Sequence, residues 1–214
     1  MWRITDDHWD GWTFHEKPYT GEFPFGLKSE FDRLAQWSPY TSPGSWPDAD
    51  MLPEGWLGPS PGWGSPRQSR LSPDEQRTEF ALWCMARSPL IFGGNLTRLD
   101  ALSRSLLSNQ TLLFIDQNAN YSRPVDIAAL GPGFDDARIW RATIAEPGAR
   151  GYAEYVAFFN LADSPLTLHA TWKQLGLDGT KYSARNVWDD SVTKESKDVS
   201  ITLPPHGSTL FELR

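Results

Sequence analysis

The change of hydrophobic period near residue 111 constrains the fold of this chain more than any other feature of its sequence. From there to the C-terminus, apolar residues mostly alternate with polar ones, as in strands with one buried face. Residues that favour turns separate the alternating stretches, which are 138–144, 152–159, 166–170, 182–188, 199–203 and 209–213. This run of short strands predicts an antiparallel β-domain of the sandwich type over residues 111–214.

The first 110 residues lack this alternation and have the helix signals of an α/β domain. Ser72 can act as an N-cap, Pro73 fits the first helical position, and Glu75 completes a capping box. This helix is expected to run to about Arg87, because Ser88-Pro89 disfavours the helical conformation. Shorter helices are expected over residues 29–37 and 100–108.

The α/β region is too short for a closed barrel. Leu90-Ile91-Phe92 is fully apolar and follows a helix, which predicts a strand buried on both faces of a parallel sheet. Residues 1–110 provide about three strand–helix units, whereas a (β/α)8 barrel takes about 250 residues. The region is therefore either a small α/β domain of unusual build or the C-terminal part of a larger one.

Composition excludes several classes of function. The net charge of the 214 residues is −7 and no basic cluster is present, so no nucleic-acid partner is expected. No apolar stretch approaches the roughly 20 residues of a membrane helix, and the residues after Met1 do not read as a signal peptide. The only cysteine, Cys84, permits no internal disulfide and is expected to be a core thiol. Compartment and oligomeric state stay open.

Tryptophan is the residue type in excess. The chain has 11, and eight of them lie at or before Trp83, in a region where eight prolines fall between Pro39 and Pro73. Aromatic side chains on loop-rich frames suit sugar binding, because the apolar face of a pyranose packs on a ring. Tryptophans also fill hydrophobic cores, and composition alone does not choose between the two roles.

Three polar clusters follow the expected strands, at residues 2–9, 43–52 and 92–96. Arg3 stands four residues before Asp7, and Asp48 and Asp50 would point the same way in an extended chain. Carboxylates and an arginine in an aromatic pocket suit glycoside hydrolysis, which needs an acid and a second carboxylate. Helix capping for Asp6-Asp7, and a turn or a metal pair for Asp48 and Asp50, are the alternatives. The four histidines have no metal-ligand spacing.

Four ordered motifs resemble the retaining α-galactosidases of glycoside hydrolase family 27, and more closely their bacterial branch. The motifs are residues 2–7, 43–52, 75–83 and 88–91. Residues 175–177, 185–188 and 205–207 look like that family's C-terminal β-domain. The resemblance implies the C-terminal part of a (β/α)8 barrel, about strands six to eight, followed by an antiparallel β-sandwich.

The resemblance also assigns roles to individual residues. In the family, the arginine of the first motif binds the galactose 2-hydroxyl, which matches Arg3. The aspartate four residues later is the general acid/base, which matches Asp7. The residue after the Asp-x-Asp of strand seven lines the sugar pocket, which matches Met51. Asp48 and Asp50 lie at the end of that strand and are expected to shape the pocket.

The chain also departs from the family. The family's nucleophile is an aspartate in a Lys-x-Asp motif that belongs upstream of the first motif here, so the 214 residues alone are expected to be inactive. A galactoside or galactosyl oligosaccharide is the expected substrate, with no metal or organic cofactor. The alternatives are α-N-acetylgalactosaminidase or β-L-arabinopyranosidase specificity, or a non-catalytic carbohydrate-binding remnant. Residues 13–28 are longer than expected and predict an added loop over the site.

Overall fold

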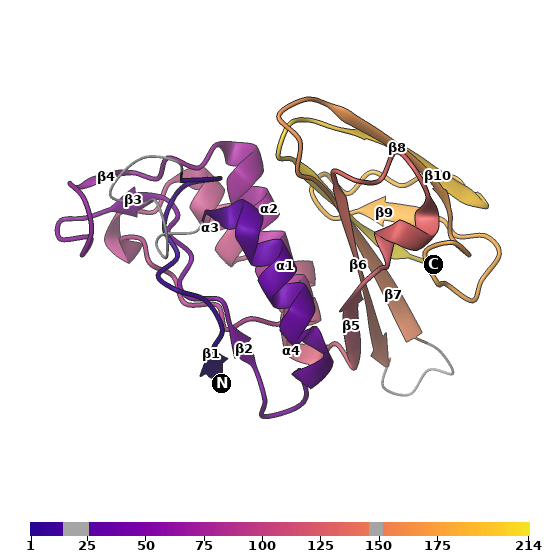
Figure 1. The fold of residues 1–214 in the computed structure, drawn as a ribbon, viewed down its shortest axis with the longest axis horizontal. Helices are drawn as coiled ribbons and strands as arrows, with labels where there is room; N and C mark the ends of the chain where they lie inside the picture. The colour runs from indigo at the N-terminus through magenta and orange to yellow at the C-terminus, as the bar shows by residue number, and fades with distance from the viewer. Residues whose placement is uncertain (15–25, 146–151) are drawn as a thin grey trace. The chain divides into compact units, whose positions relative to one another are not determined.

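The structure is a computed structural model that describes residues 1–14, 26–145 and 152–214. The chain divides into two compact units, Met1–Asp116 and Gln117–Arg214 (Figure 1). The loop predicted over residues 13–28 lies largely outside the described residues. No helix in the described part is long and apolar enough to cross a membrane.

The first three helices of the first unit confirm the signals read from the sequence, and a fourth was not predicted. The four helices are α1 (Leu27–Trp37), α2 (Pro73–Ala86), α3 (Ala101–Leu107) and α4 (Gln110–Asn118), with 3-10 turns at Ser38–Tyr40 and Leu96–Arg98. The capping box of α2 is present: Ser72 Oγ accepts from Glu75 N at 3.3 Å, and Glu75 Oε2 accepts from Ser72 N at 2.7 Å. The helix ends where Arg87 takes a left-handed conformation, with φ of +60°.

Removing this cap should weaken the first unit. Ser72→Ala deletes the acceptor of the Glu75 N–H, and losses of this kind reduce the free energy of unfolding by about 1 kcal/mol. Urea denaturation followed by tryptophan fluorescence would measure the change, because eight of the 11 tryptophans lie in this unit. Ser72→Asp keeps an acceptor at the cap and serves as the control. Equal midpoints for the alanine variant and the wild type would contradict the prediction.

Parallel pairing organises the first unit's strands. β1 (Trp2–Arg3) and β2 (Pro47–Asp48) are parallel, with Arg3 opposite Asp48. Beyond them, Leu52 forms a single parallel bridge with Phe92. The carboxyl ends of these segments therefore run out in one direction. β3 (Trp56–Leu57) and β4 (Arg67–Gln68) form a separate antiparallel pair.

Two expectations for this unit were wrong. Leu90-Ile91-Phe92 is not a strand buried on both faces: only Phe92 is bridged, and the Ile91 side chain is 44% exposed. Among the described residues the segment pairs on one side only, which leaves its other edge open. The period-two pattern also does not begin at residue 111, because residues 110–118 form α4 with Leu112 and Ile115 buried at helical spacing. The two units divide within this helix.

The second unit is the antiparallel sandwich that the alternation predicted. One sheet has five strands in the order β5-β6-β7-β11-β9, and the other pairs β10 with β8. Their bounds are β5 Tyr121–Pro124, β6 Ala137–Ala145, β7 Tyr152–Asn160, β8 Leu166–Thr171, β9 Ala184–Asn186, β10 Asp198–Leu203 and β11 Ser208–Leu213. The sequence missed β5 and the 3-10 turn Ile127–Leu130, and it made β9 too long.

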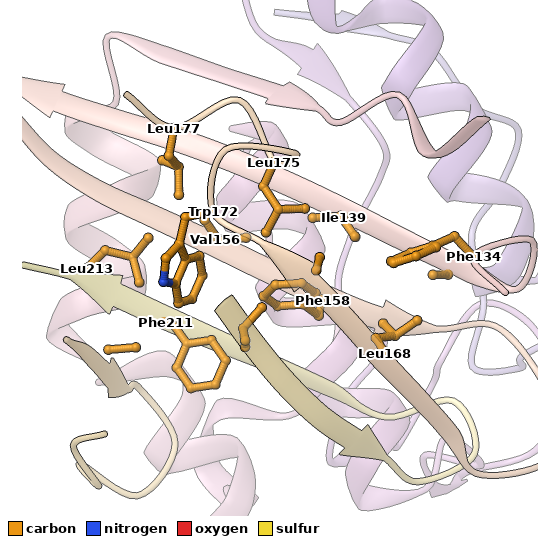
Figure 2. Packing of buried hydrophobic residues seen from close by; sticks show 14 of the residues in the cluster. Phe134, Ile139, Val156, Phe158, Leu168, Trp172, Leu175, Leu177, Phe211 and Leu213 are labelled. Atoms are coloured by element: carbon orange, nitrogen blue, oxygen red, sulfur yellow. The ribbon is translucent and has the colours of Figure 1, made fainter. Parts of the chain in front are cut away.

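A hydrophobic core lies between these two sheets (Figure 2). Phe158 of β7 and Phe211 of β11 meet edge to face, with ring centroids 6.1 Å apart. Trp172, which follows β8, is 1% exposed, and its indole Nε1 donates to the Ser196 carbonyl at 3.0 Å. Leu168 of β8 belongs to the same cluster. The second unit therefore has its own core, and the polar clusters singled out in the sequence lie in the first unit.

Candidate active site

The parallel pairing of β1 and β2 brings two of the predicted polar clusters together. Ile4 N donates to the Asp48 carbonyl at 3.0 Å, so the segments of β1 and β2 run side by side up to the points where they turn. There, Arg3 Nη2 donates to Asp50 Oδ2 at 2.6 Å and to Asp7 Oδ1 at 3.4 Å. One guanidinium therefore joins carboxylates from two strand ends that lie far apart in the sequence.

Asp50 has an unusual backbone conformation, which hydrogen bonds with three further residues stabilise in addition to the one from Arg3. Its φ is +78°, in the left-handed region that non-glycine residues seldom adopt. The Asp50 N–H donates to Asp48 Oδ1 at 2.9 Å, and its carbonyl accepts from Trp83 Nε1 at 3.0 Å. Its Oδ2 also accepts from the main-chain N–H of His8 at 2.8 Å.

This conformation corrects the expectation that the side chains of Asp48 and Asp50 point the same way. The alternation holds only while the chain is extended, and the left-handed turn at Asp50 ends the extended stretch. Asp48 is buried and caps the turn, whereas Asp50 reaches Arg3. The two carboxylates therefore have different surroundings.

Asp7 is the carboxylate of this group that is open to solvent. Its side chain is 78% exposed, and Arg3 lies beside it. Asp6 turns the other way, toward Arg33 of α1, with Asp6 Oδ2 3.9 Å from Arg33 Nη2. Of the two adjacent aspartates, Asp7 is thus the more exposed.

Met51 lies where the segment around Gly93 passes close to the segment that follows β2. A side chain on Gly93 would begin 2.5 Å from Met51 Sδ and 3.2 Å from the Leu52 carbonyl oxygen, so the methionine side chain would have to move. Asn95, which belongs to the third predicted cluster, has a structural role. Its Oδ1 accepts a hydrogen bond from Thr97 N at 2.9 Å and so caps the following 3-10 turn. Its Nδ2 donates to the Gly58 carbonyl. The third predicted cluster thus stabilises the loops on either side of it.

Several of the first unit's tryptophans pack within the loop frame. Arg67 lies between Trp9 and Trp63, with its guanidinium 5.7 and 4.9 Å from the two ring centroids. The same guanidinium makes a double contact with the buried Asp10, at 2.9 and 2.5 Å. Trp83 is fully buried. For Trp9 and Trp83, which are both buried, the structure favours the core-filling role of tryptophan.

Sequence reasoning missed the buried ionisable groups behind the strand ends. His8 and Glu79 are fully buried, and His8 Nε2 lies 2.6 Å from Glu79 Oε1. Glu30 and Glu54 are buried as well. The sequence held one signal for them, because Glu79 stands four residues before Trp83 and therefore shares the buried face of its helix.

Comparisons with known proteins cover almost the whole chain. Residues 1–118 match the family described as Alpha galactosidase A, and residues 135–213 match the Alpha galactosidase C-terminal beta sandwich domain. Alpha-galactosidase 2 of Arabidopsis thaliana is 24% identical over 99% of this chain and 46% of its own length. The chain spans about half the length of the curated relatives it matches.

Two solved structures are similar to this chain at higher sequence identity. The GH27 β-L-arabinopyranosidase of Geobacillus stearothermophilus is 33% identical with a TM-score of 0.82, over 99% of this chain and 44% of its own. A protein of Bacillus halodurans C-125, provisionally described as an α-N-acetylgalactosaminidase, is 33% identical with a TM-score of 0.78, over 98% and 46%. This chain therefore belongs to the α-galactosidase family, glycoside hydrolase family 27, with part of that family's barrel in its first unit and the C-terminal β-sandwich in its second.

Proposed function

We propose that this chain supplies the acid/base side of the active site of a retaining glycosidase that removes terminal α-D-galactosyl residues. The observation that carries the proposal is the single guanidinium of Arg3 held between Asp7 and Asp50 at the carboxyl ends of β1 and β2. In (β/α)8 enzymes the active site lies at this end of the strands. A chain that belongs to a glycosidase family and has this arrangement is best explained as part of such a site.

Asp7 is the proposed general acid/base. In the first step it protonates the glycosidic oxygen as the bond to the leaving group breaks, while a nucleophilic carboxylate attacks the anomeric carbon. In the second step Asp7 takes a proton from water, which attacks the same carbon and releases the sugar. The exposure of Asp7 supports this role, because its carboxyl can reach a bound substrate. The family resemblance assigns the nucleophile to a motif upstream of Trp2.

The other predicted site residues orient the sugar. Arg3 has five N–H donors and is proposed to bind the 2-hydroxyl, and its ion pair with Asp50 fixes its direction. Asp48 supports the turn on which Asp50 stands. Met51 is proposed to line the sugar pocket. The work of these residues is to position the substrate beside Asp7.

A second candidate specificity has a particular observation in its favour. The two solved structures at 33% identity are named for β-L-arabinopyranosides and α-N-acetylgalactosaminides, whereas the Arabidopsis α-galactosidase is 24% identical. The three sugars differ in their substituents at the ring positions next to the shared hydroxyls. Activity toward one of these two sugars is therefore the alternative to α-galactosidase activity.

The test joins this chain to upstream barrel strands in two fusions. One takes from the Geobacillus β-L-arabinopyranosidase the strands that, by the family resemblance, precede the first motif. The other takes the same strands from the Arabidopsis α-galactosidase. Release of nitrophenol is measured from the α-galactoside, the β-L-arabinopyranoside and the α-N-acetylgalactosaminide. A preference for the α-galactoside is expected in both fusions, because this chain is the part that the two fusions share.

The 214-residue chain by itself should release no more than trace nitrophenol. Acid/base assistance alone contributes about 10²–10⁴-fold, well below the accelerations of about 10⁶-fold or more that enzymes reach. Turnover by the chain alone would place the nucleophile among Asp6, Asp48 and Asp50 and would contradict this assignment. Fusions that fold by circular dichroism and hydrolyse none of the three substrates would favour a non-catalytic carbohydrate-binding remnant.

A further inference from the structure

Four ionisable side chains are buried directly behind the proposed acid/base loop. His8 follows β1, Glu30 lies on α1, Glu54 follows β2 and Glu79 lies on α2, and each is at most 1% exposed. His8 Nε2 is 2.6 Å from Glu79 Oε1, and His8 Nδ1 is 3.9 Å from Glu30 Oε1. Burial of ionisable groups is unfavourable unless hydrogen bonds or opposite charges compensate. A group of four at one place therefore calls for a specific role.

His8 connects this buried group to the strand-end carboxylates. Its main-chain N–H donates to Asp50 Oδ2 at 2.8 Å, while its ring points inward and packs on Trp83 with centroids 5.1 Å apart. The indole of Trp83 in turn donates to the Asp50 carbonyl at 3.0 Å. Glu79 and Trp83 stand one helical turn apart on α2. The helix therefore reaches Asp50 by two routes, directly through Trp83 and indirectly through Glu79 and His8.

We propose that Glu79 is a positioning residue: by holding the His8 ring, it fixes the main-chain N–H that keeps Asp50 in place beside Arg3 and Asp7. The left-handed conformation of Asp50 is unfavourable by roughly 1–3 kcal/mol for a non-glycine residue and persists only where surrounding contacts enforce it. Two of the hydrogen bonds that hold Asp50 come from the main chain of His8 and the indole of Trp83. This inference rests on the proposed function in one respect, namely that the arrangement of Arg3, Asp7 and Asp50 serves a glycosidase site.

The placement of protons follows from the same contacts. Neither carboxyl oxygen of Glu54 has a hydrogen-bond partner in the described structure. Burial and the charge of Glu79 raise the pKa of Glu54 well above its ordinary value, which favours a neutral Glu54 carboxyl. Burial raises the pKa of Glu79 as well. His8 Nδ1 has no hydrogen-bond partner in the described structure, whereas Nε2 lies 2.6 Å from Glu79 Oε1, so a ring proton finds an acceptor at Nε2.

His8 is accordingly neutral, with its proton on Nε2. Burial lowers the pKa of His8 below its ordinary value of 6.5 and outweighs the charges that face it. The charges of Glu30 from α1 and of Asp50 and Asp10 from the loops at the strand ends raise this pKa, whereas the charge of Arg3 from β1 lowers it further. Glu79 faces the ring through its hydrogen bond. The structure thus predicts one fixed tautomer for this ring.

Nuclear magnetic resonance of the ¹⁵N-labelled 214-residue chain tests the inference without any need for activity. The expected result is a His8 ring in the Nε2–H form that stays unchanged as the pH passes through 6.5. Glu79→Gln keeps an acceptor and should leave the His8 tautomer, the Trp83 indole N–H signal and the Arg3 Nε–H signal as in the wild type. Glu79→Leu removes the acceptor and should lose the ring N–H signal and shift the other two.

Cys84→Ala is the matched control, because Cys84 is fully buried on the same helix and has no hydrogen bond to His8 or Glu79 among the described residues. It should leave all three signals in place. If Glu79→Leu does not fold, His8→Phe replaces it, since the phenyl ring can still pack on Trp83 but cannot bind Glu79. That variant should shift the Trp83 and Arg3 signals in the same direction.

Two results would overturn the inference. One is a wild-type His8 that has its proton on Nδ1 or titrates near 6.5. The other is a Trp83 and Arg3 pair whose signals do not move when the Glu79–His8 hydrogen bond is lost. Inactive fusions together with the expected spectra would reject the proposed function and leave the positioning role of Glu79 standing.

Discussion

In an active fusion, Asp7→Asn is expected to lose far more rate on galactosyl oligosaccharides than on a dinitrophenyl galactoside. Protonation of the leaving oxygen matters most when the leaving group is another sugar, and a positioned acid contributes about 10²–10⁴-fold. The activated phenol leaves without such help. The second step loses its general base, so added azide, which attacks without deprotonation, should restore turnover of the activated substrate. Initial rates on both substrates with and without azide measure these effects.

Asp6→Asn is the control for this experiment. Asp6 lies one residue away but faces Arg33 of α1, at 3.9 Å, and matches no catalytic position of the family. Its replacement should change neither the substrate pattern nor the response to azide. Azide rescue in Asp6→Asn, with Asp7→Asn near the wild type, would move the acid/base role to Asp6. That result would leave the family membership of the chain unchanged.

Local signals predicted the long helices well. The capping box at Ser72 and Glu75 lies within one turn, and its energetics do not depend on the rest of the chain. α4 was missed because it is a short apolar segment, and periodicity alone does not separate a short helix from a buried strand. The prediction for residues 90–92 was wrong for a different reason. Their composition is that of a buried strand, but burial depends on neighbours that a local pattern does not contain.

The site was predictable only in part for the same reason. Family motifs pointed to Arg3 and Asp7, but the ion pair between Arg3 and Asp50 depends on the parallel register of β1 and β2. The left-handed turn at Asp50 follows from contacts with Trp83 and His8, which are remote in the sequence. A propensity argument for an Asp-x-Asp segment contains neither contact. The roles of Asp7, Arg3, Met51, Asp48 and Asp50 remain proposals that the fusions test.

Glu79 shows most clearly what a pattern misses. A glutamate on the buried face of a helix looks unfavourable by itself, and its partner His8 is 71 positions away. Only the fold reveals that the imidazole and the carboxyl meet with both groups fully buried. Buried polar pairs of this kind are specified by tertiary structure, so they are found where local sequence rules are broken.

Glu30→Gln is expected to stabilise the first unit at alkaline pH and to have little pH-dependent effect under acidic conditions. Burial raises the pKa of Glu30 from 4.5 to about 7, against the lowering influence of His8, Arg33 and Arg3, while Asp50 adds to the rise. Between these two values the folded chain holds a proton that the unfolded chain has released. The free energy of unfolding therefore falls as the pH rises through this window, and the loss is complete above about 7.

The size of this effect makes it measurable. A shift from 4.5 to about 7 corresponds to roughly 3 kcal/mol. Urea unfolding from about pH 5 to 8 should give stability curves for the wild type and Glu30→Gln that separate progressively with pH, in favour of glutamine. Any constant offset from the unpaired amide would appear at all pH values and can be subtracted. Parallel curves would show that Glu30 does not hold its proton in the folded state.

Asp116 provides an independent comparison within the same unit. Burial raises its pKa from 3.8 to about 7, opposed by Arg87, so Asp116→Asn should remove a separate part of the fall in stability. His8 contributes with the opposite sign: because burial lowers its pKa, its share of the stability is lost as the pH drops through 6.5 and below. The difference between Asp116→Asn and the wild type isolates that carboxyl from His8, whereas the difference for Glu30→Gln also includes a change in the His8 pKa, because Glu30 and His8 influence each other. If the two carboxyls titrate independently, their effects in the double variant should add, because the pKa of neither group depends on the charge of the other.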